Sequence, residues 1–201
     1  MQDTTNEPDD LLMAHLAAAR RRIAARKSLR LTGLYGGSKV WMTAALSETT
    51  PGTVVVMCES LAAGEEFRDD LRLLVGAEQV FFFPHWDTIP YDAFSPNKEL
   101  VGQRFAAMLA LREGRCPILV TTAQAAIQGM IPPEVFDELC FSVEVGGRFP
   151  RGSLVQRLVS AGYVRVDLVE APGSSASGGI LLMSFHFRKC TPCGWISLMM
   201  I

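Results

Sequence analysis

The chain has 201 residues, of which 49% are apolar and 20% charged, and its net charge is −2. This length allows one domain, or one domain with a smaller partner, and the charge gives no bulk electrostatic sign of a nucleic-acid-binding protein. No apolar run reaches the roughly 18 residues that suggest a membrane span, and the polar, acidic N-terminus is unlike a signal peptide. We therefore expect a cytoplasmic protein whose Cys58, Cys116 and Cys140 are reduced, buried thiols.

The first 28 residues are expected to form a tail and a helix. Residues 1–10 are acidic and are expected to be disordered, and residues 11–26 have the pattern of a helix capped by Asp9 or Asp10. The helix ends in a cationic run that suits the helix dipole, namely Arg20, Arg21, Arg22, Arg26 and Lys27. We interpret this run as a solvated face in preference to a nucleic-acid contact.

A glycine-rich turn follows an apolar segment, 29–34, that is predicted to be a strand, and a helix to about residue 46 comes next. This is the layout of a phosphate-binding loop, which needs a glycine before the lysine and a hydroxyl residue after it to hold Mg²⁺. Here Ser38 takes the glycine position and Val40 replaces the hydroxyl residue. We predict a degenerate nucleotide loop that neither binds nor hydrolyses ATP, formed by Gly33, Gly36, Gly37, Ser38 and Lys39.

Strands and helices then alternate as far as residue 131. Apolar runs at 53–58, 80–83 and 118–122 predict buried strands, and helices are predicted from Ser60 to about residue 75, from Asn97 or Ser95 to Gly114, and after 122 to about residue 130. The alternation predicts an α/β domain over residues 29–131, similar to a P-loop NTPase, with a parallel sheet covered by helices on both faces. The Ile-Pro-Pro sequence at 131–133 is interpreted as its boundary.

An unusual loop joins the second of these strands to the next helix. It reads FPHWDTIPYDAFSP from residue 83 and is richer in rings and prolines than an ordinary surface loop, so we expect it to pack against its own domain or a partner. The loop residues that we select are Trp86, Asp87, Pro90, Tyr91, Asp92, Ser95 and Pro96.

Residues 132–173 have a different pattern, typical of the start of a small α+β domain. An alternating strand is predicted at 140–145, a helix capped by Ser153 runs to residue 160, and another strand follows Gly162 at 163–169.

The loop sequence resembles a segment of the bacterial transcription-repair coupling factors near their N-terminus. The segment VTTAQAAIQ at 120–128 and the region from residue 145 to Gly173 resemble the same family, so the likeness covers 29–173. It implies a first domain like that of the excision protein UvrB with its nucleotide site lost, followed by a second domain that docks UvrA. The contacts with RNA polymerase and DNA, and the use of ATP and Mg²⁺, are implied only for translocase domains that this chain lacks.

The resemblance stops after Gly173, where the family continues with a different sequence. Suppose that codons are chosen freely for residues 173–201 and are then read in the frame that starts at the third base of each codon. One such choice encodes EFGVRGDTLDVFPFSEMHPLRVDFFDDD, which resembles the missing continuation. We therefore interpret 174–201 as an out-of-frame tail, and its Cys190-Thr191-Pro192-Cys193 as an accidental pair and not a zinc or redox site. Ser177 and Gly178 fall where the resemblance places a docking arginine, so the docking surface is expected to be damaged.

The resemblance implies a protein-binding module of DNA repair, acting at most as a UvrA-docking fragment without translocase activity, and we do not expect this chain to be catalytic. The alternatives are a P-loop ATPase or UvrB-like fragment that still binds nucleotide through Lys39, and a metal or redox protein that uses Cys190 and Cys193. The strands at 141–145 and 163–169 are expected to lack sheet partners, with the chain after 173 loosely held.

Overall fold

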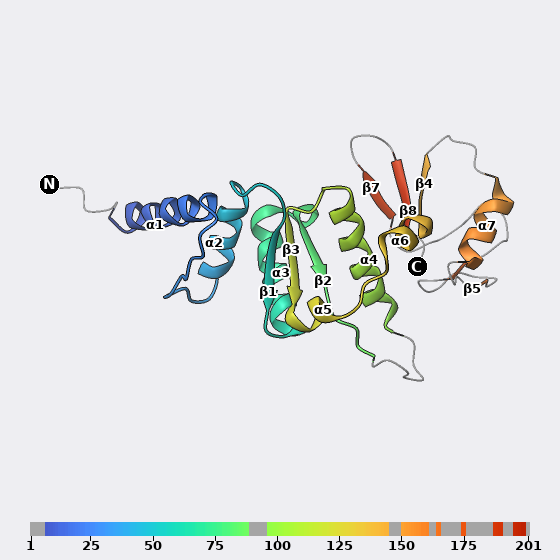
Figure 1. Cartoon of the computed structure of the whole chain (residues 1–201), viewed down its shortest axis with the longest axis horizontal. Helices are drawn as coiled ribbons and strands as arrows, with labels where there is room; N and C mark the ends of the chain where they lie inside the picture. The colour runs from blue at the N-terminus through green and yellow to red at the C-terminus, as the bar shows by residue number, and fades with distance from the viewer. Residues whose placement is uncertain are drawn as a thin grey trace. The chain divides into compact units, whose positions relative to one another are not determined.

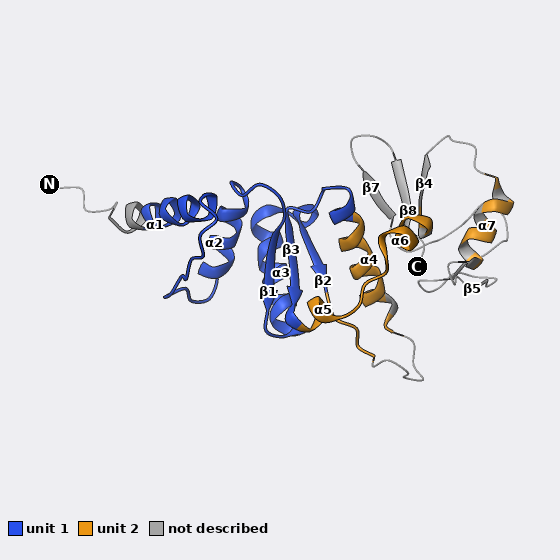
Figure 2. Cartoon of the chain, viewed as in Figure 1, with its two compact units in different colours: residues 1–83, 110–123 blue, residues 84–109, 124–201 orange. Residues whose placement is uncertain are grey.

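The structure is a computed structural model that describes residues 7–88, 96–144, 150–160, 164–165, 174–175, 187–190 and 195–199 (Figure 1). It divides into two compact units (Figure 2). Unit 1 consists of residues 1–83 and 110–123, and unit 2 of residues 84–109 and 124–201. The predicted domain boundaries at 28, 131 and 173 stay predictions.

A parallel three-stranded sheet lies at the centre of unit 1. Its strands are β1 (Val54–Cys58), β2 (Val80–Phe83) and β3 (Ile118–Thr122), in the order β1-β3-β2. Val54 and Val80 are both in register with Ile118, so the strands start at the same edge. The predicted α/β class is confirmed, and so are the predicted strands at 53–58, 80–83 and 118–122.

Burial differs between the inner strands and β1. Every residue of β2 and β3 is buried, as expected of a strand covered on both faces. The expectation that β1 is equally buried was wrong, because Val55 and Met57 are 56% and 59% exposed. β1 is an edge strand, and only its alternate residues point toward the core.

Two helices supply the core of unit 1. They are α2 (Ser38–Ser47) and α3 (Leu61–Val75), and side chains from both join sheet residues in one buried cluster: Val40, Ala44, Leu71, Val80, Phe82, Ile118 and Val120. Ser60 caps α3 as predicted, since its Oγ accepts a hydrogen bond from the Ala63 N–H at 3.2 Å. A short 3₁₀ turn, η1 (Ala77–Gln79), leads from α3 into β2.

The N-terminal part of unit 1 departs from two predictions. Helix α1 (Glu7–Ala24) begins before Asp9 and Asp10, which lie inside it and are not its caps. Residues 29–34 form no strand. Leu29 and Leu31 are 37% and 39% exposed, and Gly33 has a φ of +78°, so this short run has neither a sheet neighbour nor a fully buried face to hold it extended.

Unit 2 contains most of α4 (Lys98–Arg112) and of α5 (Ala123–Ile127), together with α6 (Pro133–Leu139) and α7 (Arg151–Ser160). The rings of Phe105 in α4 and Phe136 in α6 stack with their centroids 5.7 Å apart. Helix α6 was not predicted, because Pro132 and Pro133 were interpreted only as a boundary, although proline also suits the first turn of a helix. Ser153 lies inside α7 and does not precede it, so its predicted capping role was wrong.

The strands of unit 2 have backbone partners. β4 (Cys140–Glu144) pairs with β8 (Trp195–Met199), which pairs in turn with β7 (Phe187–Cys190), both antiparallel. β5 (Val164–Arg165) pairs in parallel with β6 (Ser174–Ser175). The expectation that the strands near 141–145 and 163–169 lack partners was therefore wrong, because residues after 173 supply the hydrogen-bonding edges. The rest of the tail lies outside the described residues.

Within the described part of the chain, no helix is long and apolar enough to cross a membrane.

Candidate functional site

The start of the ring-rich loop is held by a buried arginine. β2 ends at Phe83, and the next residue, Pro84, is fully buried. Its carbonyl oxygen accepts a hydrogen bond of 2.6 Å from Nη1 of Arg104, a residue of α4. A buried carbonyl needs a donor, and the guanidinium supplies a charged one.

Arg104 also binds the loop through a ring and an amide. Its guanidinium carbon lies 4.3 Å from the centroid of the Trp86 ring. Gln128 Oε1 accepts two hydrogen bonds, one from the Trp86 backbone N–H at 2.8 Å and one from Arg104 Nη1 at 3.4 Å. We call Pro84, Trp86, Arg104 and Gln128 the Arg104 cluster. It joins the loop, α4 and the segment after α5, all within unit 2.

The electrostatics of the cluster follow from burial. Arg104 is 2% exposed, and this burial lowers the pKa of its guanidinium to about 10. The side chain therefore stays protonated at neutral pH. Burying a cation is costly unless its donors are used, and the Pro84 carbonyl, the Gln128 amide and the Trp86 ring face together provide that compensation.

The end of the loop is tied to its start by a second polar contact. The Asp87 carboxylate accepts from the backbone N–H of Asn97, at 3.2 and 3.3 Å. Asn97 in turn caps α4, as predicted, because its Oδ1 accepts from the Glu99 N–H at 2.9 Å. Asp87 thus links the two ends of a segment whose middle, residues 89–95, lies outside the described residues.

The glycine-rich turn has a different character. Gly33 and Gly36 have φ values of +78° and +53°, and the Ser38 hydroxyl donates to the Tyr35 carbonyl at 2.7 Å, which closes a tight turn. Lys39 is exposed. Val40, which stands where a phosphate-binding loop carries its Mg²⁺ ligand, is 4% exposed and packs in the core of unit 1. The turn has no strand before it, so it lacks the usual layout of such a loop.

Comparison with known proteins gives consistent relatives. The chain is 33% identical over 157 residues to the transcription-repair-coupling factor of Bacillus subtilis (strain 168), an alignment that covers 77% of the chain and 13% of the relative. It is 31% identical over 189 residues to that of Myxococcus xanthus, covering 85% of the chain and 16% of the relative. No family model matches the chain.

The chain belongs to the transcription-repair-coupling factor family. The factor of Escherichia coli (strain K12) is 27% identical over 164 residues, covering 81% of the chain and 14% of the relative. The chain thus spans 13% to 16% of the length of these transcription-repair-coupling factors.

Only some of the residues that we selected from the sequence of this coupling-factor chain lie in the part that the structure describes. Trp86, Asp87 and Pro96 are described at the two ends of the loop, with Trp86 in the Arg104 cluster and Asp87 bonded to Asn97. The other selected loop residues lie outside the described part: Pro90, Tyr91, Asp92 and Ser95. The same holds for Cys193 and for Ser177 and Gly178, where the docking arginine was expected.

Sequence reasoning missed Arg104 and Gln128. The signal for Arg104 was its spacing, because it lies three residues after Val101 and four before Met108, on the apolar side of α4. A cation on the apolar side of a helix indicates either a buried hydrogen bond or an error in the assumed helix face. Gln128 gave no comparable signal, since it closes a short helix at an ordinary polar position.

Proposed function

We propose that the chain is the N-terminal module of a transcription-repair coupling factor and that its contribution there is protein docking. In the full-length factor this module would recruit UvrA to a site where stalled RNA polymerase is displaced, while other domains of that factor would supply translocation on DNA. The similarity to coupling factors over 77% to 85% of the chain carries this proposal.

The geometry of the Arg104 cluster supports a structural role for the ring-rich loop in preference to a catalytic one. The Arg104 cluster uses its polar groups internally, since the guanidinium and the Gln128 amide are engaged with the loop backbone and with each other. Such an arrangement holds a loop in place and leaves no group with the geometry of a nucleophile and its base. We propose that the loop is a structural signature of the family and that the docking surface lies in the segment after residue 132.

Nucleotide hydrolysis is the less favoured function. The side chain of Val40 lies in the buried cluster that also contains Ala44 and Leu71, and it has no oxygen to offer Mg²⁺. Titration of the chain with a fluorescent ATP analogue, beside Lys39→Ala, would test this. We expect no saturable binding, and Lys39-dependent binding would favour the ATPase alternative.

UvrA binding is the direct test of docking. We would compare the chain that carries its own residues 174–201 with a version in which they are replaced by EFGVRGDTLDVFPFSEMHPLRVDFFDDD, using immobilised UvrA and biolayer interferometry. The version with the replaced tail is expected to bind UvrA. The chain with its own tail is expected to bind at least tenfold more weakly, since losing one anchoring arginine contact costs about 2 to 5 kcal/mol. Failure of both versions to bind would contradict the proposed docking.

The coding DNA decides the origin of the tail. Sequencing across codons 165–201 and beyond is expected to show that string in another frame. Its absence would make the present tail genuine and would direct attention to zinc and thiol assays on Cys190 and Cys193.

A further inference from the structure

The end of α1 carries an unusual concentration of positive charge. Six cationic side chains lie between residues 20 and 30, with no Asp or Glu among them, in a chain whose net charge is −2. The helix dipole accounts for cations in the last turn of α1, where Arg21 and Arg22 lie. It does not account for Arg26, Lys27 and Arg30, which follow the end of the helix at Ala24.

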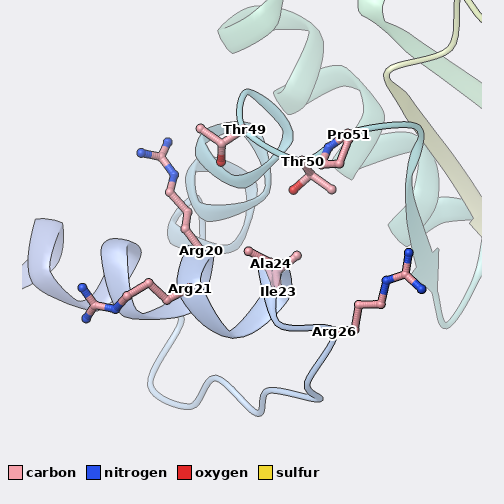
Figure 3. A pocket seen from close by; sticks show the side chains of 8 residues that line it. All are labelled: Arg20, Arg21, Ile23, Ala24, Arg26, Thr49, Thr50 and Pro51. Carbon is pink, nitrogen blue, oxygen red and sulfur yellow. The ribbon is translucent and has the colours of Figure 1, made fainter.

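These cations border a hollow in unit 1. The hollow has a volume of about 670 Å³ and is lined by Arg20, Arg21, Ile23, Ala24, Arg26, Thr49, Thr50 and Pro51. Figure 3 shows Ile23 and Ala24 between the arginines, with Thr50 and Pro51 across the opening. The three guanidinium groups are spread around the rim and do not converge on one point. This spacing suits a ligand with several separate negative charges better than a single bound anion.

Most of the rim has no internal charge partner. Arg20 is engaged, because its Nη2 donates to the Ala45 carbonyl at 2.7 Å and lies 3.6 Å from Glu48 Oε2. Its Nε is buried and has no acceptor within the described residues. Arg21 and Arg26 have no carboxylate within 4.0 Å in that part of the chain, and both are exposed. Their charge is therefore open to a partner.

The backbone at Arg26 is a second, independent observation. Arg26 N–H bonds to the Ile23 carbonyl and Lys27 N–H to the Arg22 carbonyl, at 2.8 and 2.9 Å. This is the helix-ending motif that usually has glycine at its left-handed position. Helix α4 ends in the same way, with Gly114 at φ +65° in that position.

At the end of α1 the left-handed position, with φ +54°, holds Arg26 in place of glycine. A residue with a Cβ is strained in this conformation. The backbone conformation alone would therefore favour glycine at this position. We attribute the presence of arginine to its side chain, which lies on the rim of the hollow.

The hollow changes the interpretation of this run, which the sequence alone favoured as a solvated face. We propose that the hollow and its arginine rim form a binding site for the sugar-phosphate backbone of a nucleic acid. Arginine forks can donate to successive phosphates, and guanidinium groups that lie apart around the rim suit a chain of charges better than one phosphate. The site contacts no base edge and reads no sequence. It goes beyond the proposed UvrA docking and does not depend on it, because it lies in unit 1 and is tested without UvrA.

Fluorescence anisotropy with labelled single-stranded and duplex DNA tests the site, using the whole chain at NaCl concentrations from about 50 to about 200 mM. The test variant is Arg21→Ala/Arg26→Ala. The control, Arg112→Ala/Arg115→Ala, removes the same charge from exposed positions at the end of α4. The test variant is expected to bind DNA about tenfold more weakly than the parent chain. The negative slope of log K against log salt should become less steep by about 2. The control is expected to stay within roughly twofold of the parent chain.

A further variant separates binding from folding. Arg26→Gly removes the side chain and also relieves the left-handed strain, so DNA binding should weaken while the denaturation midpoint stays or rises. An equal loss of DNA affinity in the test and control double variants would show that binding depends only on the overall charge of the chain, and it would overturn the proposal. Binding of polyglutamate with the same dependence on Arg21 and Arg26 would also overturn it, because the partner would then be an acidic protein.

Discussion

Replacing Arg104 with methionine tests whether the Arg104 cluster holds the ring-rich loop. Methionine keeps much of the aliphatic volume and removes the guanidinium, so the polar contribution is isolated from cavity formation. The Pro84 carbonyl then loses its 2.6 Å donor and the Trp86 ring loses its cation. We expect the change to act first on residues 84–88 and on the first turns of α4, where the contacts are made.

The expected magnitude is the difference between two larger effects. A lost charged hydrogen bond costs about 1.5 to 3 kcal/mol, the orphaned carbonyl about 1 to 3, and the cation–ring contact about 0.5 to 2. Against this, the variant no longer buries a cation, and the lowering of the Arg104 pKa from 12.5 to about 10 corresponds to roughly 3 kcal/mol. The net destabilisation is therefore about 2 kcal/mol. Arg104→Lys keeps one charged donor and should cost about 1 kcal/mol.

Hydrogen exchange followed by mass spectrometry is the suitable assay, because a chain of two units need not unfold in one step. Peptides covering 84–88 and 98–109 should exchange faster in Arg104→Met by the factor that corresponds to about 2 kcal/mol, roughly thirtyfold. Arg112→Met, at an exposed position near the end of the same helix, is the control and should change exchange by under about 0.5 kcal/mol. Unchanged exchange at 84–88 in Arg104→Met would refute the reasoning.

Three further predictions concern the cap of α4, two helical glycines and a half-buried thiol. Asn97→Ala removes the cap of α4 and should lower stability by about 1 kcal/mol, measured as faster exchange in the first turn of that helix, with Asn97→Asp as a rescuing control. Gly64→Ala should destabilise by about 1 kcal/mol despite better helix propensity, because its Cβ would lie 3.0 Å from Cε2 of the buried Phe82 ring. Gly152→Ala, in α7, is the matched case with open space and should stabilise by about 0.5 kcal/mol. The steric argument would be contradicted if hydrogen exchange changed in the same direction in α3 of Gly64→Ala and in α7 of Gly152→Ala. Burial, with a nearby carboxylate, raises the pKa of Cys140 to about 11, so its thiolate fraction at pH 8.5 is roughly a hundredfold below that of an ordinary thiol. Alkylation by iodoacetamide should be correspondingly slow and should accelerate up to about pH 11, and a rate that levels off near pH 9 would contradict this pKa.

The strands of unit 1 could be predicted because their composition is decisive. The runs at 54–58, 80–83 and 118–122 contain no charged residue, glycine or proline and consist mostly of β-branched or aromatic residues, and such runs suit a buried parallel sheet. The segment at 29–34 is also short, but Arg30, Thr32 and Gly33 interrupt its three leucines, and it forms no strand. A short apolar run takes its conformation from its neighbours, and no sequence pattern states which neighbours will be present.

The Arg104 cluster could not be predicted as a unit because its members come from three separated segments. Composition identified the loop, and the Asn97 cap followed from local helix chemistry. The pairing of Trp86 with Arg104 and of both with Gln128 depends on the packing of α4 beside the loop, which local patterns do not encode. The backbone partners of β4 were missed for a related reason, since a segment interpreted as an out-of-frame tail was not considered as a source of strands.

The loop contacts separate two explanations of its unusual composition. The Trp86 ring contacts the Arg104 guanidinium, and the Asp87 carboxylate accepts a hydrogen bond from the Asn97 backbone N–H. These two residues therefore serve the architecture of unit 2 itself. If the remaining selected residues, at 90–95, also served only architecture, substituting them should reduce protection at 84–88 and 98–109 as Arg104→Met does. If they serve a partner, substitution should leave that exchange unchanged and weaken binding in the full-length factor. Hydrogen exchange on Tyr91→Ala therefore assigns the loop to one of these roles before any partner is known.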